Sequence, residues 1–340
     1  MDISIGKPLS FREIGNKDNQ EDYVFPSPQV VGEQDKVFIV CDGMGGHSHG
    51  EVASSTVATA LGTFMKSHYP ADGLLTKALF DEGMQYAYSQ LNSVDDGAVK
   101  KMGTTLTFVG LHKEGCFCAH IGDSRIYIVR PSENRIIYRS EDHSLVNDLI
   151  RAGELLPEEA ASYPHKNVIT RAMQPNQEKS AKAEVRNISD VQSGDYVFLC
   201  SDGILENLSD EMLISILSSN VEDSKKLDAI KNECFGKTRD NYTCYLIPIV
   251  SVNEIRVSEK EKVQSVLTRS YPVKGWACLV FILTFLLLFS VGVRWAYNCG
   301  KEMHKEGMEK TGTIEIGKLD IMGLTDTIVD EEVSIIADSY

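Results

Sequence analysis

Residues 37–46 read VFIVCDGMGG. The first five are apolar and rich in β-branched and aromatic side chains, which predicts a buried strand. The strand runs into Asp42 and Gly43, and an aspartate followed by glycine by itself indicates no more than a turn. The same arrangement recurs elsewhere in the chain, and the recurrence carries the functional prediction.

Acidic residues stand beside small or turn-forming residues at the ends of four other strand-like runs. They are Glu21-Asp22 before YVF, Gly122-Asp123-Ser124 after CFCAHI, Ser201-Asp202-Gly203 after VFLC, and Asp240 before YTCYLIPI. Strand ends can bring carboxylates to one edge of a sheet, where they repel one another unless a cation neutralises them. Oxygen ligands without paired His or Cys favour Mg²⁺ or Mn²⁺ over zinc. Gly43 would let its backbone carbonyl approach such an ion.

Residues 1–250 are predicted to form one domain. Seven strand-like runs alternate with five helix-like stretches near residues 50–69, 74–91, 142–153, 209–219 and 223–235. Two groups of strands, each with a pair of helices, predict an α+β fold: an α-β-β-α sandwich of two antiparallel sheets flanked by helices. The short links HKEG and GDS predict that runs 104–111, 116–121 and 125–130 pair antiparallel in succession.

One segment departs from the pattern of a water-soluble domain. Residues 276–293 are uncharged, and Lys274 and Arg294 flank them. Residues 276–297 are long enough to cross a bilayer, with Trp and Tyr at both edges, so we predict a single transmembrane helix rather than a buried core helix. Residues 251–275 would be a juxtamembrane linker and residues 298–340 an acidic tail.

Composition limits the partners and the compartment. The formal net charge of −15, without a basic run, argues against nucleic acid as a partner. The eight cysteines form no CxxC pair, which is typical of buried thiols in a reducing compartment. The first fifteen residues lack an apolar core, so we expect no secretory signal. A single-pass membrane protein with a cytoplasmic catalytic domain is predicted.

The motifs together resemble the metal-dependent type 2C protein phosphatases, especially the bacterial branch. The resemblance covers about residues 10–250 and rests on six motifs in order: Glu21-Asp22, Asp42-Gly43-Met44-Gly45-Gly46-His47, Gly103-Thr104-Thr105, Gly122-Asp123-Ser124-Arg125, Ser201-Asp202-Gly203 and Asp240-Asn241-x-Thr243. It implies the same α-β-β-α sandwich and hydrolysis of phosphoserine and phosphothreonine in proteins. Substrates would be phosphoproteins, in opposition to a serine/threonine kinase.

The resemblance also implies a site with two Mn²⁺ or Mg²⁺ ions. Asp42 would bridge both ions, Asp202 and Asp240 would complete one, and the Gly43 carbonyl and Glu21 would complete the other. Asp22 would order the bound waters, and Asp123 would bind a weaker third ion. A water shared by the two ions would attack phosphorus. Asp42, Asp202 and Asp240 are therefore the predicted catalytic residues.

This sequence departs from the family pattern at three positions. Lys17 stands where the family places an arginine that binds the substrate phosphate, and lysine lacks the two-pronged fork. Met44 replaces a suspected general acid, so leaving-group protonation falls to water or to His47, although a lone histidine among glycines is more often structural. Glu206 replaces an aspartate of the third-ion site. The resemblance places a flap at residues 142–174, in which Arg171 anchors the loop more readily than it contacts substrate.

Two alternatives remain beside an active phosphatase. The chain could be a catalytically weak or dead relative that binds phosphopeptides at a membrane, although intact Asp42, Asp202 and Asp240 argue against this. The acidic tail could also sense a signal and regulate the phosphatase domain, which would supplement the first hypothesis.

Overall fold

The computed structural model describes residues 2–45, 49–97, 101–165 and 168–253. They belong to a compact unit that runs from Met1 to Arg256. None of the helices in these ranges is long and apolar enough to cross a membrane. The predicted membrane helix 276–297, the acidic tail and most of the predicted linker lie outside the described residues.

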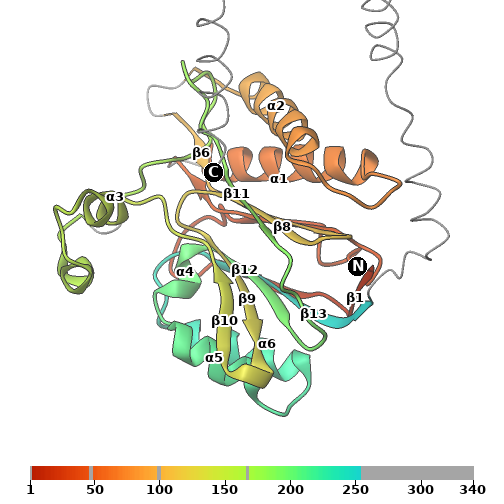
Figure 1. The fold of residues 1–340 in the computed structure, drawn as a ribbon. Coiled ribbons are helices and arrows are strands. Elements are labelled where there is room, and N and C mark those ends of the chain that lie inside the picture. Colours follow the sequence, from red (N-terminus) through yellow and green to blue (C-terminus); the bar gives the residue numbers. More distant parts are fainter. Residues whose placement is uncertain (1, 46–48, 98–100, 166–167, 254–340) are drawn as a thin grey trace, which may run out of the picture. The chain divides into compact units, whose positions relative to one another are not determined.

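Two antiparallel sheets lie face to face (Figure 1). In the first sheet, β13 (Tyr242–Asn253) is flanked on one side by β1 (Asp2–Ile5) and β2 (Leu9–Glu13). On its other side follow β12 (Tyr196–Cys200), β9 (Arg125–Arg130) and β10 (Arg135–Arg139). The second sheet has the order β11 (Glu184–Ile188), β8 (Gly115–Ile121), β7 (Leu106–His112), β4 (Val37–Cys41) and β3 (Tyr23–Phe25). A small ribbon pairs β5 (Gly43–Met44) with β6 (Gly103–Thr104).

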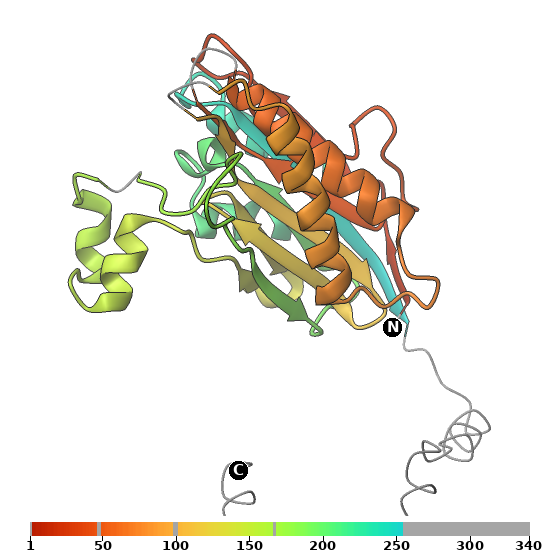
Figure 2. The same ribbon diagram turned by 90° about the horizontal axis from the view of Figure 1, so that it is seen from above.

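Helices cover the outer faces of both sheets (Figures 1 and 2). The helices α1 (His49–Ser67) and α2 (Lys77–Ser93) pack on the second sheet. The helices α4 (Asp202–Leu205), α5 (Asp210–Ser218) and α6 (Asp223–Cys234) pack on the first sheet. The four layers agree with the α-β-β-α sandwich expected from the sequence.

The period-two alternation of the strands divides the core into three layers. On β4, Ile39 packs against α1 and α2, whereas Phe38 and Val40 pack between the sheets. On β12, Val197 faces the space between the sheets and Phe198 faces the helices of the other side. Because both faces of these strands are covered, their sequences are nearly continuous apolar runs.

One predicted strand pairing is wrong. β8 and β9 do not form a hairpin, because β8 belongs to the second sheet and β9 to the first. Three residues span roughly 10 Å, which is about the separation of packed sheets. The GDS link is therefore long enough to connect one sheet to the other, as well as to form a hairpin loop. Gly122 has a φ of +101°, and a Cβ there would lie 2.6 Å from the Thr105 side chain.

A lobe that contains α3 (Leu145–Ala152) and the 3-10 helix η2 (Pro157–Ser162) projects away from the two sheets (Figures 1 and 2). Ser144 caps α3 by accepting a hydrogen bond from the Asn147 N–H, and Gly153 ends it in the left-handed conformation. This lobe occupies the position predicted for the flap. The strands β1, β2 and β11 and the short helix α4 were not predicted.

Candidate active site

The predicted site residues converge at one edge of the sandwich. A cavity of about 440 Å³ is lined by Lys17, Asp18, Asn19, Glu21, Asp42, Gly43, Met44, Gly45, Ile169, Asp202 and Asp240. Six predicted site residues are therefore brought together from four separate segments of the chain. Asp22 and Asp123 do not line the cavity, but their charges act on Asp42.

Asp42 is held by the motif Gly103-Thr104-Thr105. Its backbone N–H donates to Thr105 Oγ1 at 2.9 Å, and its carbonyl accepts from the Thr105 N–H at 2.8 Å and from Thr104 Oγ1 at 2.9 Å. Thr105 Oγ1 also lies 2.8 Å from Ser124 Oγ, in the crossing that carries Asp123. The motif therefore fixes two acidic segments at once, a role that the sequence analysis did not assign.

Asn241 fixes the segment that carries Lys17 and Glu21. Its side-chain oxygen accepts from the Glu21 N–H at 2.7 Å, and its side-chain nitrogen donates to the carbonyls of Ile14 at 2.7 Å and Asn19 at 2.9 Å. All three bonds join the start of β13 to the loop between β2 and β3. The only available sequence signal was its position beside Asp240.

Asp22 lies fully buried behind the cavity-lining acids. Ser201 Oγ donates to Asp22 Oδ2 at 2.7 Å and accepts from the Thr243 N–H at 3.0 Å. Ser201, the neighbour of Asp202 in sequence, therefore holds Asp22, and the Thr243 backbone in turn holds Ser201. This position agrees with a supporting role rather than direct exposure to substrate.

Gly43 has a steric reason to be glycine. A Cβ at this position would lie 2.2 Å from the Gly50 carbonyl oxygen and 2.5 Å from the Glu21 carbonyl oxygen. The first turn of α1 therefore packs directly on the backbone after Asp42. Any side chain would push α1 away from the acidic cluster.

Burial and mutual repulsion act on the acidic side chains. Burial, opposed in part by the hydrogen bond from Ser201, raises the pKa of Asp22 to about 7. Burial and the charge of Asp202 raise the pKa of Asp123 to about 8. Burial, then the charges of Asp22, Asp202 and Asp123, raises the pKa of Asp42 well above its usual range, and burial likewise raises that of Asp202. The folded protein therefore concentrates negative charge at this edge at an energetic cost.

The donor set fits divalent cations. Within the described part of the chain, Asp22 Oδ1, Asp123 Oδ1 and Asp202 Oδ1 are buried without a hydrogen-bond partner. Buried polar atoms in native proteins are almost always satisfied, so carboxylate oxygens without protein partners in one cluster indicate a binding site for a positive ligand. Hard oxygen donors of this kind suit Mn²⁺ or Mg²⁺.

Lys17 contributes the positive charge at the rim of the cavity. Its Nζ lies 2.8 Å from Asp240 Oδ1, and its side chain is 46% exposed. Partial burial alone would lower the pKa of Lys17, but the hydrogen bond to Asp240 and the charges of Asp42 and Glu21 raise it. The ammonium is therefore charged and accessible to an anion.

The other singled-out residues lie as follows. Met44 lines the cavity, and His47 is outside the described residues. Glu206 Oε2 accepts from the Arg239 N–H at 2.9 Å, so it supports the backbone before Asp240 while its charge acts on Asp202. Arg171 Nη1 lies 3.2 Å from His143 Nε2, which places it within the loop rather than in the catalytic cavity.

A second group of possible metal ligands lies elsewhere in the described residues: His120, His143 and Glu184. The two imidazole rings are stacked, with centroids 4.5 Å apart and planes 4° apart. Because ring lone pairs lie in the ring plane, parallel stacked rings do not direct them at a common ion. The Gly122 N–H also donates to His143 Nδ1 at 3.1 Å, which leaves the ring proton of the neutral histidine on Nε2. We therefore assign this group to hydrogen bonding.

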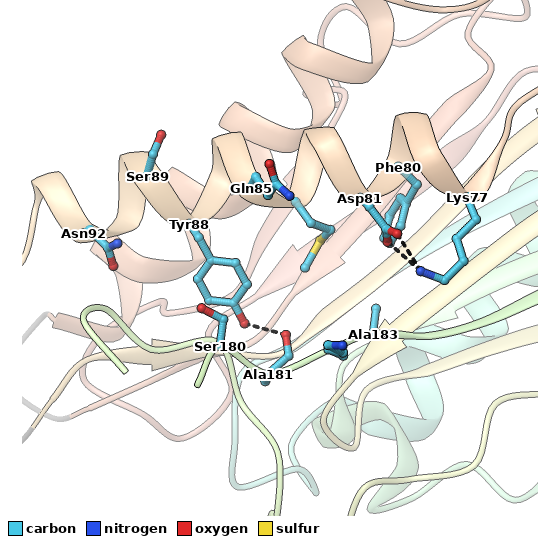
Figure 3. A pocket seen from close by; sticks show the side chains of 12 residues that line it. Lys77, Phe80, Asp81, Gln85, Tyr88, Ser89, Asn92, Ser180, Ala181 and Ala183 are labelled. Carbon is cyan, nitrogen blue, oxygen red and sulfur yellow. Dashed lines mark hydrogen bonds and ion pairs between the residues drawn. The ribbon is translucent and has the colours of Figure 1, made fainter. Parts of the chain in front are cut away.

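A cavity of about 710 Å³ lies between α2 and residues 180–183 (Figure 3). Tyr88 crosses it and donates from its hydroxyl to the Ala181 carbonyl at 2.8 Å. Its acidic residue, Asp81, is paired with Lys77 at 2.6 Å. This larger cavity therefore lacks unpaired carboxylates of the kind found at the cavity beside Asp42.

Comparison with known proteins agrees with this geometry. The model of the family described as protein phosphatase 2C matches residues 12–226. The chain belongs to the protein phosphatase 2C family. The phosphatase PhpP of Streptococcus pneumoniae is 31% identical over 255 residues, which cover 75% of this chain and 98% of that protein.

Solved structures of serine/threonine phosphatases also match the chain. The serine/threonine phosphatase PstP of Mycobacterium tuberculosis superposes with a TM-score of 0.60 at 27% identity, covering 72% of this chain and 99% of that one. The catalytic domain of a PstP, solved with two manganese ions, matches with a TM-score of 0.58 at 27% identity and covers 74% and 100% of the two chains. These matches confirm the predicted enzyme class, a metal-dependent protein phosphatase of type 2C.

Proposed function

We propose that the chain hydrolyses phosphoserine and phosphothreonine in proteins at the acidic cavity. The observation that carries the proposal is the convergence of Glu21, Asp42, Asp202 and Asp240, with buried carboxylate oxygens nearby that lack partners. The curated and structural relatives named as serine/threonine phosphatases support the choice of substrate. The phosphoproteins would be products of a serine/threonine kinase.

Each side chain has a proposed role. Asp42, Asp202 and Asp240 would hold one cation, and Asp42, the Gly43 carbonyl and Glu21 would hold a second. Bound Mn²⁺ or Mg²⁺ would supply a Lewis acid and an activated water nucleophile. Asp22 supports the cluster from behind, and Asp123 is placed to take part in a weaker third site. Lys17, charged at the rim, binds and orients the phosphate.

The test uses the full chain in detergent micelles with a phosphothreonine peptide. We expect phosphate release with Mn²⁺, loss of release with EDTA, and loss in the variant Asp42→Asn. Peptide binding without turnover, with either Mn²⁺ or Mg²⁺, would favour the alternative of a catalytically dead phosphopeptide-binding module.

We also propose that residues 276–297 anchor the protein in a membrane as one helix, with the catalytic domain in the cytoplasm. The support is the uncharged run 276–293 between Lys274 and Arg294. The full chain should stay with membranes during alkaline carbonate extraction, and a variant without residues 276–297 should be released. Release of the full chain would disprove the anchor. The role of the acidic tail as a sensor is tested by deleting residues 299–340 and measuring activity.

A further inference from the structure

Two segments of the site meet at His143, which is buried between them. One is the crossing Gly122-Asp123-Ser124, which carries an acidic side chain of the cluster. The other is the strand-like return from the α3 lobe, residues 168–171. Ile169 of that return lines the catalytic cavity.

His143 makes a closed pair of bonds with Gly122. Its backbone N–H donates to the Gly122 carbonyl at 2.9 Å, and its ring Nδ1 accepts from the Gly122 N–H at 3.1 Å. Both polar groups of the residue before Asp123 are therefore held by one residue. These two bonds fix the backbone that leads into Asp123 and so restrict the direction of the Asp123 side chain.

His143 also holds the return from the α3 lobe. Its carbonyl accepts from the Thr170 N–H at 2.8 Å. Its Nε2, which carries the ring proton, faces the Glu184 carboxylate at 3.7 Å, whereas Arg171 Nη1 at 3.2 Å is a second donor and forms no hydrogen bond with Nε2. The neighbouring residue Ser144 forms a bridge with Ile169. The ring stacks on His120, whose Nε2 donates to the Glu141 carbonyl at 2.7 Å. The ring orientation is therefore fixed on both sides.

We infer that His143 is a positioning residue that joins the Asp123 turn, through ring Nδ1, to the loop that borders the catalytic cavity, through its backbone carbonyl. The backbone bonds of His143 to Gly122 and Thr170 would survive any substitution, but the ring bond to the Gly122 N–H would not. The consequence for catalysis rests on the proposed phosphatase function, whereas the coupling itself is a property of the folded chain.

Asn and Gln separate the ring bond from the bulk of the side chain. In His143→Asn, the side-chain oxygen can replace Nδ1 as the acceptor of the Gly122 N–H. In His143→Gln, the oxygen lies one methylene further out, which leaves the Gly122 N–H without its acceptor. His112→Asn is a matched control, because His112 is also buried and bonds Asn187 at 2.6 Å, on the strands β7 and β11 away from the cavity.

The primary measurement is amide hydrogen exchange of the full chain in micelles. We expect His143→Gln to speed exchange at residues 122–124 by about two- to tenfold, the range that one lost hydrogen bond allows. His143→Asn should preserve the exchange rates of those amides, because its side-chain oxygen replaces Nδ1. His112→Asn should leave exchange at residues 122–124 unchanged, apart from the effect of any change in global stability.

Mn²⁺ binding supplies the second measurement. His143→Gln should raise the Mn²⁺ concentration that gives half of the maximal thermal stabilisation, because Asp123 is less well positioned, whereas His143→Asn should leave that concentration unchanged. Identical exchange patterns in the Asn and Gln variants would overturn the inference. If the wild-type chain shows no turnover, the proposed function fails, but the exchange data still decide the role of His143.

Discussion

The strands β9 and β12 lie side by side and have charged side chains at both ends, but the two ends differ. At one end, Arg130 closes β9 and Asp195 precedes β12. At the other end, Asp123 precedes β9 and Asp202 follows β12. The first end pairs opposite charges, whereas the second gathers like charges.

The Arg130 end is fully satisfied. Arg130 donates from Nε to Asp195 Oδ1 at 2.9 Å and from Nη2 to Asp195 Oδ2 at 3.0 Å, with both side chains almost fully buried. Nη2 and Nη1 also donate to Asp190. The hydrogen bonds from Arg130 to Asp195 hold the pKa of Arg130 above its usual range. Such an ion pair can only support the fold, because nothing is left to bind a ligand.

The acidic end keeps its carboxylates unpaired and their pKa values raised. The difference teaches that buried charge alone does not identify a functional site. A bidentate ion pair whose hydrogen bonds are all made within the protein indicates a structural role. Several acids with buried carboxylate oxygens that lack partners indicate a site for a cation. The following predictions test this distinction, in order of decreasing effect.

Asp42→Asn should lower kcat/KM by at least about a hundredfold, because it removes a charge on which the cation site depends. In EDTA the variant should be as stable as the wild type or more so, because one of several repelling charges is gone. Phosphopeptide turnover and urea unfolding measure the two effects. Activity within tenfold of the wild type would show that Asp42 is no part of the reaction.

Arg130→Met should have the opposite profile. It leaves Asp195 buried and unpaired, so the free energy of unfolding should fall by about 3–5 kcal/mol. The double variant Arg130→Met/Asp195→Leu should recover most of the loss, because both charges are removed. Turnover per folded molecule should stay unchanged in both variants. A large loss of turnover in the double variant would mean that this end also serves the reaction.

Mn²⁺ should stabilise the wild type but not Asp42→Asn. At a free concentration 100 times its Kd, an ion that binds only the folded state adds about 2.7 kcal/mol. Differential scanning calorimetry with Mn²⁺ and with EDTA provides the measurement. An identical melting temperature in both conditions would contradict a formed cation site.

The stability of the metal-free protein should also depend on pH. Asp22 and Asp123 have raised pKa values of about 7 and about 8, against an ordinary value of 3.8. Well below pH 3.8 these groups are protonated in both the folded and the unfolded state, so they do not lower the free energy of unfolding. As pH rises from about 4 to about 8 the unfolded chain ionises first, so the free energy of unfolding falls in EDTA. Stabilisation by Mn²⁺ should therefore be larger at pH 8 than at pH 6.

Lys17→Ala should have the smallest effect. Lys17 is exposed, and exposed ion pairs contribute about 0.2–1 kcal/mol, so KM should rise no more than about fivefold. Lys17→Arg should leave KM unchanged or lower it, because guanidinium binds phosphate with two parallel hydrogen bonds. Steady-state kinetics with Asp18→Asn as a neighbouring control would separate Lys17 from the general charge of the loop.

Much of this molecule could be predicted from local patterns. The apolar runs at residues 37–41 and 196–200 are strands because both of their faces are buried, and the Asp-Gly pairs that follow them are turns. The helices α1, α2, α5 and α6 appear close to the expected positions. The acidic residues of the site were found because each stands at a strand end, where side chains from distant segments can meet.

The chemical type of the site was thus present in the sequence: carboxylates in a repeated setting, which call for a hard cation. Only the tertiary structure decided which sheet each strand joins, because a three-residue link fits both a hairpin and a crossing between sheets. It also decided which residues hold the acids in place. Thr105, Ser201, Asn241 and His143 act through hydrogen bonds between segments far apart in sequence, and no local pattern encodes such partners.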